Sequence, residues 1–66
     1  MSKEVLQAAY ALADSGKCRD YWDVEMELLA SGHSAAEARR ATADAKTREA
    51  LNYRCTMAMF GSRLRA

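Results

Sequence analysis

The hydrophobic residues of the chain recur at helical spacing in three successive segments, each bounded by residues that favour helix ends. In the first segment they follow an i, i+4, i+7 pattern, which predicts a helix over residues 3–14. Gly16 lies just beyond it, where a left-handed glycine often ends a helix. A second helix is predicted over 21–31, because Asp20 is a favourable N-cap and Gly32 follows its last residue.

The third segment has a clear helix start, but its pattern does not decide between one helix and two. Ser34 and Glu37 stand at the S-x-x-E spacing of a capping box, which predicts that a helix begins at residue 35. Strong helix formers fill 35–60, so these residues can form one long helix or two helices with a break near 43–46. Three residues are alternative N-caps for a second helix: Thr42, Asp44 and Thr47.

The pattern as a whole predicts a single helical domain over residues 1–66. Gly61 is expected to end the last helix, and residues 62–66 are expected to be frayed. No segment shows the strict alternation of a strand, and the chain contains no proline. The predicted fold is all-α, a small bundle of three to four short helices in which the second and third are helix-turn-helix-like.

The second predicted helix carries two hydrophobic ridges, about 100° apart on a helical wheel. The ridges are Tyr21, Val24 and Leu28, and Trp22, Met26 and Leu29. Glu25 lies between them, and burying both ridges in one core would also bury its carboxylate, which is costly without a partner. We therefore expect one ridge to pack on the chain itself and the other on another chain, with Glu25 reaching a cation or solvent. The alternative is that Trp22 fills the centre of the core.

Composition indicates a small hydrophobic core. The chain has 66 residues, and 50% are hydrophobic by type, but fourteen of these are alanines, which bury little area. Chains of this size usually gain stability from disulfides, a metal or a second subunit. We therefore expect a homodimer, in which two copies double the core. The predicted dimer seam lies on the last helix and comprises Leu51, Cys55, Met57, Ala58 and Phe60.

Charge is divided unevenly along the chain. Residues 1–37 contain three basic and seven acidic side chains (net −4), and residues 38–66 contain seven basic and two acidic (net +5). Such halves are complementary within or between chains, which favours association. Aromatic residues and arginines most often anchor protein interfaces, while aspartates steer a contact toward a basic patch. The predicted partner-binding residues are Asp20, Tyr21, Trp22, Asp23, Arg39 and Arg40.

The residues that carry most catalytic and metal chemistry are sparse. His33 is the single histidine, and Cys18 and Cys55 have no second ligand at metal-binding spacing, so we expect no metal site. No nucleophile motif or phosphate-binding glycine loop occurs, so we expect neither an enzyme nor a cofactor. Cys55 is interpreted as a small buried hydrophobe. Cys18, between Lys17 and Arg19, would be a reactive thiol of lowered pKa if it were exposed.

DNA binding is the main alternative to protein binding. The second and third predicted helices, joined through Gly32, have the length of a helix-turn-helix, and Arg39 and Arg40 lie on the helix that would read DNA. That helix begins Ala35-Ala36-Glu37-Ala38, which offers no donors to base edges. The helix before it would bring carboxylates to the phosphates, which is the wrong charge. A small helix-turn-helix DNA-binding regulator is therefore the second hypothesis.

Four groups of residues carry a resemblance to a known family. They are the run Tyr10-Ala11-Leu12-Ala13-Asp14-Ser15-Gly16, the run Tyr21-Trp22-Asp23-Val24-Glu25 with Leu28 and Gly32, the pair Ala38-Arg39, and Arg48 with Leu51 and Cys55. This pattern resembles a family of very small proteins encoded by transposable (Mu-like) bacteriophages and related prophages. Within that family it is similar to anti-activators of quorum sensing. The pattern consists of helix anchors and contains no catalytic signature.

The resemblance implies a compact helical homodimer that is made early in infection, in the cytoplasm of the bacterial host. It implies that the protein binds a host acyl-homoserine-lactone-responsive transcription activator of quorum sensing and blocks DNA binding by that activator. The type IV pilus assembly ATPase is implied as a second target. The sequence agrees with a cytoplasmic location, because it shows neither a secretory signal nor an apolar run of ~18 residues. A structural phage component that forms large assemblies is a third hypothesis.

Overall fold

The computed structural model describes the backbone of residues 2–65 and the side chains of residues 3–61. Four helices occupy most of this part of the chain: α1 (Ser2–Asp14), α2 (Tyr21–Ala30), α3 (Ala35–Ala41) and α4 (Ala45–Arg65). The described residues contain no strand, so the predicted all-α fold is confirmed. None of the described helices is both long enough and apolar enough to cross a membrane.

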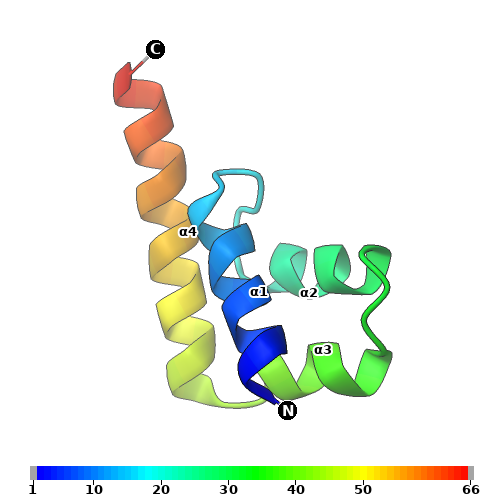
Figure 1. Ribbon diagram of the computed structural model, residues 1–66. Coiled ribbons are helices and arrows are strands. Elements are labelled where there is room, and N and C mark those ends of the chain that lie inside the picture. Colours follow the sequence, from blue (N-terminus) through cyan, green and yellow to red (C-terminus); the bar gives the residue numbers. More distant parts are fainter. Residues whose placement is uncertain (1, 66) are drawn as a thin grey trace.

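Helix α1 lies at the centre of the arrangement and packs against each of the other three helices. Helices α1 and α4 lie side by side, while α2 and α3 lie one above the other and run in opposite directions across them (Figure 1). Helix α4 has 21 residues, and its C-terminal part extends beyond the other helices. This projecting part therefore has few neighbours from its own chain.

The local signals for helix starts act as the sequence predicts. Asp20 caps α2, and its Oδ1 accepts a hydrogen bond of 3.1 Å from the N–H of Asp23. Ser34 and Glu37 form a reciprocal capping box at the start of α3. The Glu37 N–H donates to Ser34 Oγ at 3.1 Å, and the Ser34 N–H donates to Glu37 Oε1 at 3.0 Å. These bonds satisfy N–H groups that have no partner inside the helix.

Two glycines provide the turns that follow α1 and α2. Gly16 has φ of +82° and Gly32 has φ of +100°, both in the left-handed region that a residue without Cβ adopts readily. The observed helix bounds differ by one residue from those predicted, since α1 begins at Ser2 and α2 ends at Ala30. The glycine signals therefore located both helix ends.

The helical conformation is interrupted between α3 and α4, so the two-helix alternative for residues 35–60 is confirmed. Residues 42–44 separate the two helices. Arg48 holds this corner, because its Nε donates to the Thr42 carbonyl at 2.7 Å and its Nη2 donates to the Ala43 carbonyl at 3.2 Å. Carbonyl groups at a helix end lack partners within the helix, so these two bonds stabilise the break.

Gly61 does not end the last helix, and that prediction is wrong. Helix α4 continues through Gly61 to Arg65. A glycine that ends a helix takes a positive φ, whereas Gly61 is not among the positive-φ residues of the described chain. The backbone of residues 62–65 is helical, the fraying expected over 62–66 stays a prediction, and Ala66 lies outside the described residues.

The core is small and rich in short side chains. Its buried residues are Val5, Ala9, Ala13, Cys18, Val24, Leu28, Ala38, Ala41, Leu51 and Cys55. Leu28 and Leu51 are the largest fully buried side chains. Alanine at four of these positions lets neighbouring helix backbones approach closely, but it buries little area. The structure therefore has the small hydrophobic core that the composition of the chain indicates.

Candidate functional site

The two hydrophobic ridges of α2 have different environments. Val24 and Leu28, from the first ridge, are fully buried, and Tyr21 packs against the core beside them. The second ridge is exposed, by 55% at Trp22, 39% at Met26 and 37% at Leu29. We call these three exposed residues the α2 ridge. The alternative in which Trp22 fills the core is therefore wrong, and the prediction that the two ridges have separate environments is confirmed.

An open groove of about 350 Å³ lies beside the α2 ridge, between α2 and the corner that joins α3 to α4. The lining residues of this α2–α3 groove are Tyr21, Trp22, Glu25, Arg39, Thr42, Ala43 and Arg48. The Tyr21 N–H donates to Oδ1 of Asn52 on α4 at 2.8 Å, which fixes the start of α2 against α4. The Arg48 guanidinium carbon lies 5.6 Å from the centroid of the Tyr21 ring, within the range of a cation–π contact.

Glu25 lies at the boundary between the two ridges, as its position on the helical wheel predicts. Its Oε1 accepts a hydrogen bond of 2.8 Å from Oγ1 of Thr42. Glu25 is half-buried and lines the open groove, so its carboxylate reaches solvent as expected, and it has a hydroxyl group as an additional partner. Thr42 is 4% exposed and is the one buried polar residue of the described chain. The bond consequently ties α2 to the α3–α4 corner from within the groove.

Two of the predicted partner-binding residues, Asp20 and Asp23, take part in the start of α2. Asp23 Oδ2 accepts a hydrogen bond of 3.0 Å from the Arg19 N–H and lies 3.6 Å from Nε of the same residue. Asp20 is exposed, and Asp23 is half-buried. The Asp20 carboxylate caps α2, the Asp23 carboxylate binds Arg19 of the preceding loop, and both give that side of the helix a negative charge.

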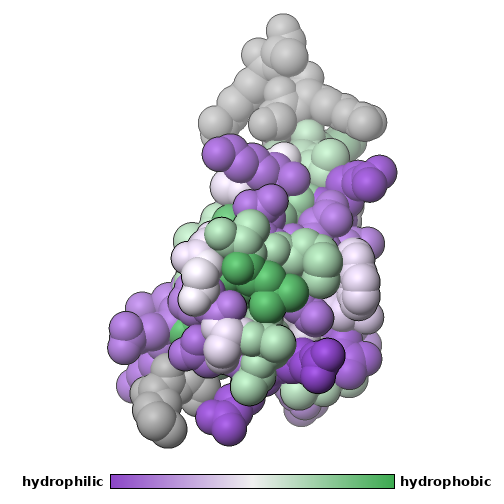
Figure 2. Space-filling view, turned by 90° about the vertical axis from the view of Figure 1, so that its right-hand side faces the viewer, coloured by the Kyte–Doolittle hydropathy of each residue, from purple (hydrophilic) through white to green (hydrophobic). Residues whose placement is uncertain are grey.

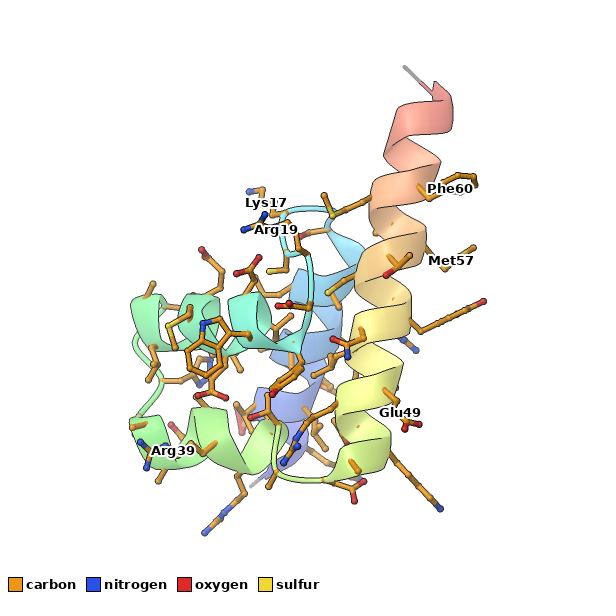
Figure 3. All side chains as sticks on the ribbon, turned by 180° about the vertical axis from the view of Figure 1, so that it is seen from behind. Lys17, Arg19, Arg39, Glu49, Met57 and Phe60 are labelled. Atoms are coloured by element: carbon orange, nitrogen blue, oxygen red, sulfur yellow. The ribbon has the colours of Figure 1, made fainter. Side chains whose placement is uncertain are left out.

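The structure brings Arg39, but not Arg40, next to the predicted aromatic anchors. Arg39 lines the α2–α3 groove together with Tyr21 and Trp22. Figure 3 shows Arg39 on α3. Arg40 is exposed on the same helix and does not line the groove. Within residues 3–61, no ion pair involves Arg39, so its charge is available to a partner.

A second exposed hydrophobic surface runs along α4. Its residues are exposed by 67% at Tyr53, 49% at Met57 and 56% at Phe60. Their i, i+4, i+7 spacing places them on one face of the helix, and we call this face the α4 stripe. Met57 and Phe60 point away from the other three helices (Figure 3). The packing of this chain therefore leaves the α4 stripe uncovered.

The predicted dimer seam is divided by the structure. Leu51 and Cys55 are fully buried within one chain, so their assignment to a contact between copies is wrong. Ala58 is half-buried, while Met57 and Phe60 are exposed. Tyr53 is not part of the predicted seam, but it is exposed on the same face, and its i, i+4 spacing from Met57 is the signal that identifies it. The face of α4 that packs on α1 decides this division.

Both cysteines are buried and free. Burial raises the pKa of Cys18, and the nearby carboxylates of α2 and its cap raise that pKa further. Burial is also the largest cause that raises the pKa of Cys55 from 9.0 to about 11. Lys17 and Arg19 extend outward from the loop between α1 and α2 (Figure 3). Cys18 therefore lacks the exposure that a reactive thiol needs, whereas Cys55 is confirmed as a small buried hydrophobe.

His33 lies in the turn between α2 and α3, with Nδ1 3.9 Å from Oε1 of Glu37. Its side chain is 29% exposed and is therefore half-buried. Among the residues whose side chains are described, no three from histidine, cysteine, aspartate and glutamate converge in a group that could hold a metal ion.

Hydrophobic residues gather in the middle of one face of the molecule, with hydrophilic residues around them (Figure 2). Together, the α2 ridge, the α2–α3 groove beside it and the α4 stripe are surfaces suited to binding other chains. No protein-family model, curated protein or solved structure matches the chain.

Proposed function

We propose that the protein is a non-enzymatic binding module that inhibits a host protein by covering part of its surface. The observation that carries the proposal is the exposure of Trp22, which is 55% accessible in a chain that contains a single tryptophan. A chain with so few large hydrophobic residues gains stability by burying them. An exposed tryptophan beside an arginine is therefore better explained by a binding role, because these residue types dominate interface hot spots.

The family resemblance supplies the identity of the target in this proposal. The target is a host transcription activator of quorum sensing, and the complex blocks DNA binding by that activator; the type IV pilus assembly ATPase is a second target. A DNA-binding domain carries a basic surface. The carboxylates of Asp20, Asp23 and Glu27 at one side of the α2 ridge are complementary to such a surface. In this proposal the protein acts in the cytoplasm of the host.

Self-association through the α4 stripe is part of the same proposal. Tyr53, Met57 and Phe60 present three large apolar side chains on a helix that extends beyond the body of the molecule. Two copies related by a two-fold axis can cover the stripe on each other, because the same patch then serves both partners. The α2 ridge lies on another helix and remains free for the target.

Two observations favour this proposal over DNA binding by the chain itself. Arg54 Nη1 lies 3.0 Å from Oδ2 of Asp14, so the charge of this cation is neutralised within the chain. The helix that would read bases, α3, has only seven residues. Phosphate contacts need free cations, and base readout needs a helix that reaches into the major groove.

The test measures whether the protein blocks the purified activator from binding its operator DNA, followed by fluorescence anisotropy of labelled DNA. Trp22→Ala is expected to weaken inhibition at least tenfold, whereas Trp22→Phe, which keeps an aromatic ring, retains most of it. Gln7→Ala, at an exposed position on α1, is the matched control. Circular dichroism checks that each variant is folded. Unchanged inhibition by folded Trp22→Ala contradicts the proposal.

A further inference from the structure

The α2 ridge is bordered by opposite charges on its two sides. On a helical wheel centred on Trp22, Glu25 and the groove behind it lie about 60° to one side, while Asp23 and Glu27 lie about 100–140° to the other. The groove side carries the guanidinium groups of Arg39 and Arg48. The surface therefore consists of three parallel strips, which are basic, hydrophobic and acidic in that order.

The groove side is positive because its two guanidinium groups outnumber its one carboxylate. Glu25 Oε1 accepts the hydroxyl of Thr42 at 2.8 Å. Arg48 donates from Nε and Nη2 to backbone carbonyls, which carry no net charge, so its positive charge is not neutralised. Arg39 forms no ion pair with any residue in the described part of the chain. Two guanidinium groups thus face one hydrogen-bonded carboxylate along this edge.

The opposite side of the ridge is negative. Glu27 is exposed, and Asp23 shares its charge with Arg19 at 3.6 Å. The carboxylates of Asp23, Glu27 and Asp20 all act on the pKa of Cys18, which places them around one side of α2. The negative strip is therefore a group of neighbouring charges and does not depend on a single residue.

The α2 ridge has the length and spacing of one helix contact. Trp22, Met26 and Leu29 follow i, i+4, i+7 spacing. At a rise of ~1.5 Å per residue, the ridge extends for roughly 10 Å, or about two turns. A partner helix lying along it would place three hydrophobic residues at matching intervals, which is the usual pattern of helix recognition in a groove.

We propose that this face binds one amphipathic helix of the target, whose apolar stripe is bordered by acidic side chains along one edge and by basic side chains along the other. The acidic edge lies over Arg39 and Arg48, and the basic edge lies over Asp23 and Glu27. This inference rests on the proposed function and specifies the part of the target that is bound. Single-stranded nucleic acid fits less well, because the acidic strip repels phosphates along the whole ridge.

The inference is tested with three synthetic helical peptides that share one leucine stripe. The first carries glutamate along one edge of the stripe and lysine along the other, the second carries lysine along both edges, and the third carries glutamate along both. Each is titrated into the full chain at low salt, and binding is followed by the emission of Trp22, the single tryptophan. The mixed peptide is expected to bind at least tenfold more tightly than the other two and to shift the emission to shorter wavelength. Equal binding of the three, or tightest binding of a single-charge peptide, overturns the inference.

Charge reversal on each border provides the second measurement. Arg39→Glu and Glu27→Lys change exposed side chains, and each is expected to weaken the mixed peptide about tenfold, the equivalent of 1.4 kcal/mol. Arg39→Glu is also expected to make the peptide with lysine on both edges the tightest binder, a gain that damage to the fold cannot produce. Gln7→Ala is the matched control. Single-stranded oligothymidine is titrated in the same way. If it quenches Trp22 emission in a salt-sensitive manner and binds more tightly than the mixed peptide, the inference is also overturned.

The two proposals fail in different ways. If Trp22→Ala abolishes inhibition of the activator but the chain shows no preference for the mixed peptide, the helix inference is wrong and the proposed function stands. If the chain prefers the mixed peptide but Trp22→Ala inhibits the activator normally, the face binds a helix and the proposed function is wrong.

Discussion

Thr42 donates a hydrogen bond of 2.8 Å from Oγ1 to Oε1 of Glu25, and its carbonyl accepts a second bond of 2.7 Å from Nε of Arg48. One buried residue thus joins α2, the end of α3 and the first turns of α4. The same three elements form the α2–α3 groove. The groove therefore keeps its shape through this residue, and a change there affects both stability and binding.

Replacing Thr42 with valine tests this relationship. Valine keeps the shape of the side chain but removes the donor, so one oxygen of a half-buried carboxylate loses its partner; the expected cost is about 1–3 kcal/mol. Thr42→Ser keeps the hydroxyl and is the matched control. Urea unfolding, followed by circular dichroism, gives the two free energies. Equal stability of the valine and serine variants contradicts a role for the hydroxyl.

The positions of Leu51 and Met57 predict opposite effects of truncation to alanine. Leu51 is fully buried in its own chain, so Leu51→Ala is expected to cost about 2–5 kcal/mol at every protein concentration. Met57 is 49% exposed, so Met57→Ala is expected to change the stability of the single chain by less than about 0.5 kcal/mol. The Met57→Ala substitution is expected to lower stability only at higher protein concentration, because there it weakens dimerisation. Urea unfolding at two protein concentrations separates these effects.

Sedimentation velocity measures the association itself. The proposed dimer through the α4 stripe predicts that Met57→Ala and Phe60→Ala shift the wild-type dimer toward the monomer. Gln7→Ala, on α1, leaves the distribution unchanged. If the loss of stability in Leu51→Ala disappears on dilution, Leu51 stabilises the contact between copies and not the single chain.

The buried cysteines give a prediction about chemical modification and pH. Cys18 and Cys55 are 0% exposed, and both have raised pKa values, so iodoacetamide at pH 8 is expected to label neither in the folded protein and both in urea. Mass spectrometry counts the added groups. Rapid labelling of Cys18 without urea contradicts its burial.

The same pKa shift predicts how stability changes at alkaline pH. The Cys55 pKa rises from 9.0 in the unfolded reference to about 11 in the fold, so the folded state keeps its proton where the unfolded state has lost it. The contribution of this group is therefore complete below pH 9.0 and is lost as the pH rises toward about 11. A Cys55→Ala variant is expected to show a smaller loss of stability over this window.

The local features of the fold could be predicted from the sequence because their causes are local. Asp20, Ser34 and Glu37 satisfy N–H groups within three residues, and Gly16 and Gly32 adopt their conformation without help from distant residues. The two ridges of α2 also follow from helical spacing alone. Each of these features depends on residues that are close together in the chain.

The features that could not be predicted depend on how distant segments pack. Leu51 and Tyr53 lie two positions apart on one helix, and only the packing of α1 against α4 decides that the first is buried and the second exposed. The groove requires Trp22 of α2 and Arg39 of α3 to meet across a turn. Helical propensity alone does not decide whether residues 35–60 break before α4, because Arg48, which stabilises the break, contacts carbonyls five and six residues earlier.

Two glycines provide a test of the helix ends in which only the backbone conformation differs. A Cβ added at Gly32 or at Gly61 meets no heavy atom within 4 Å, so neither substitution causes a collision. Gly32 has φ of +100°, where an L side chain is strained, and Gly32→Ala is expected to cost roughly 1–2 kcal/mol. Gly61 lies inside α4, so Gly61→Ala is expected to stabilise the protein by about 0.5–1 kcal/mol.

For a domain of this size, 1 kcal/mol corresponds to roughly 4–8 °C in Tm, so a thermal scan resolves both changes. If Gly61→Ala instead lowers Tm, the result indicates that the helix ends at Gly61, as its position in the sequence suggests. Alanine there would then meet the same backbone strain as at Gly32.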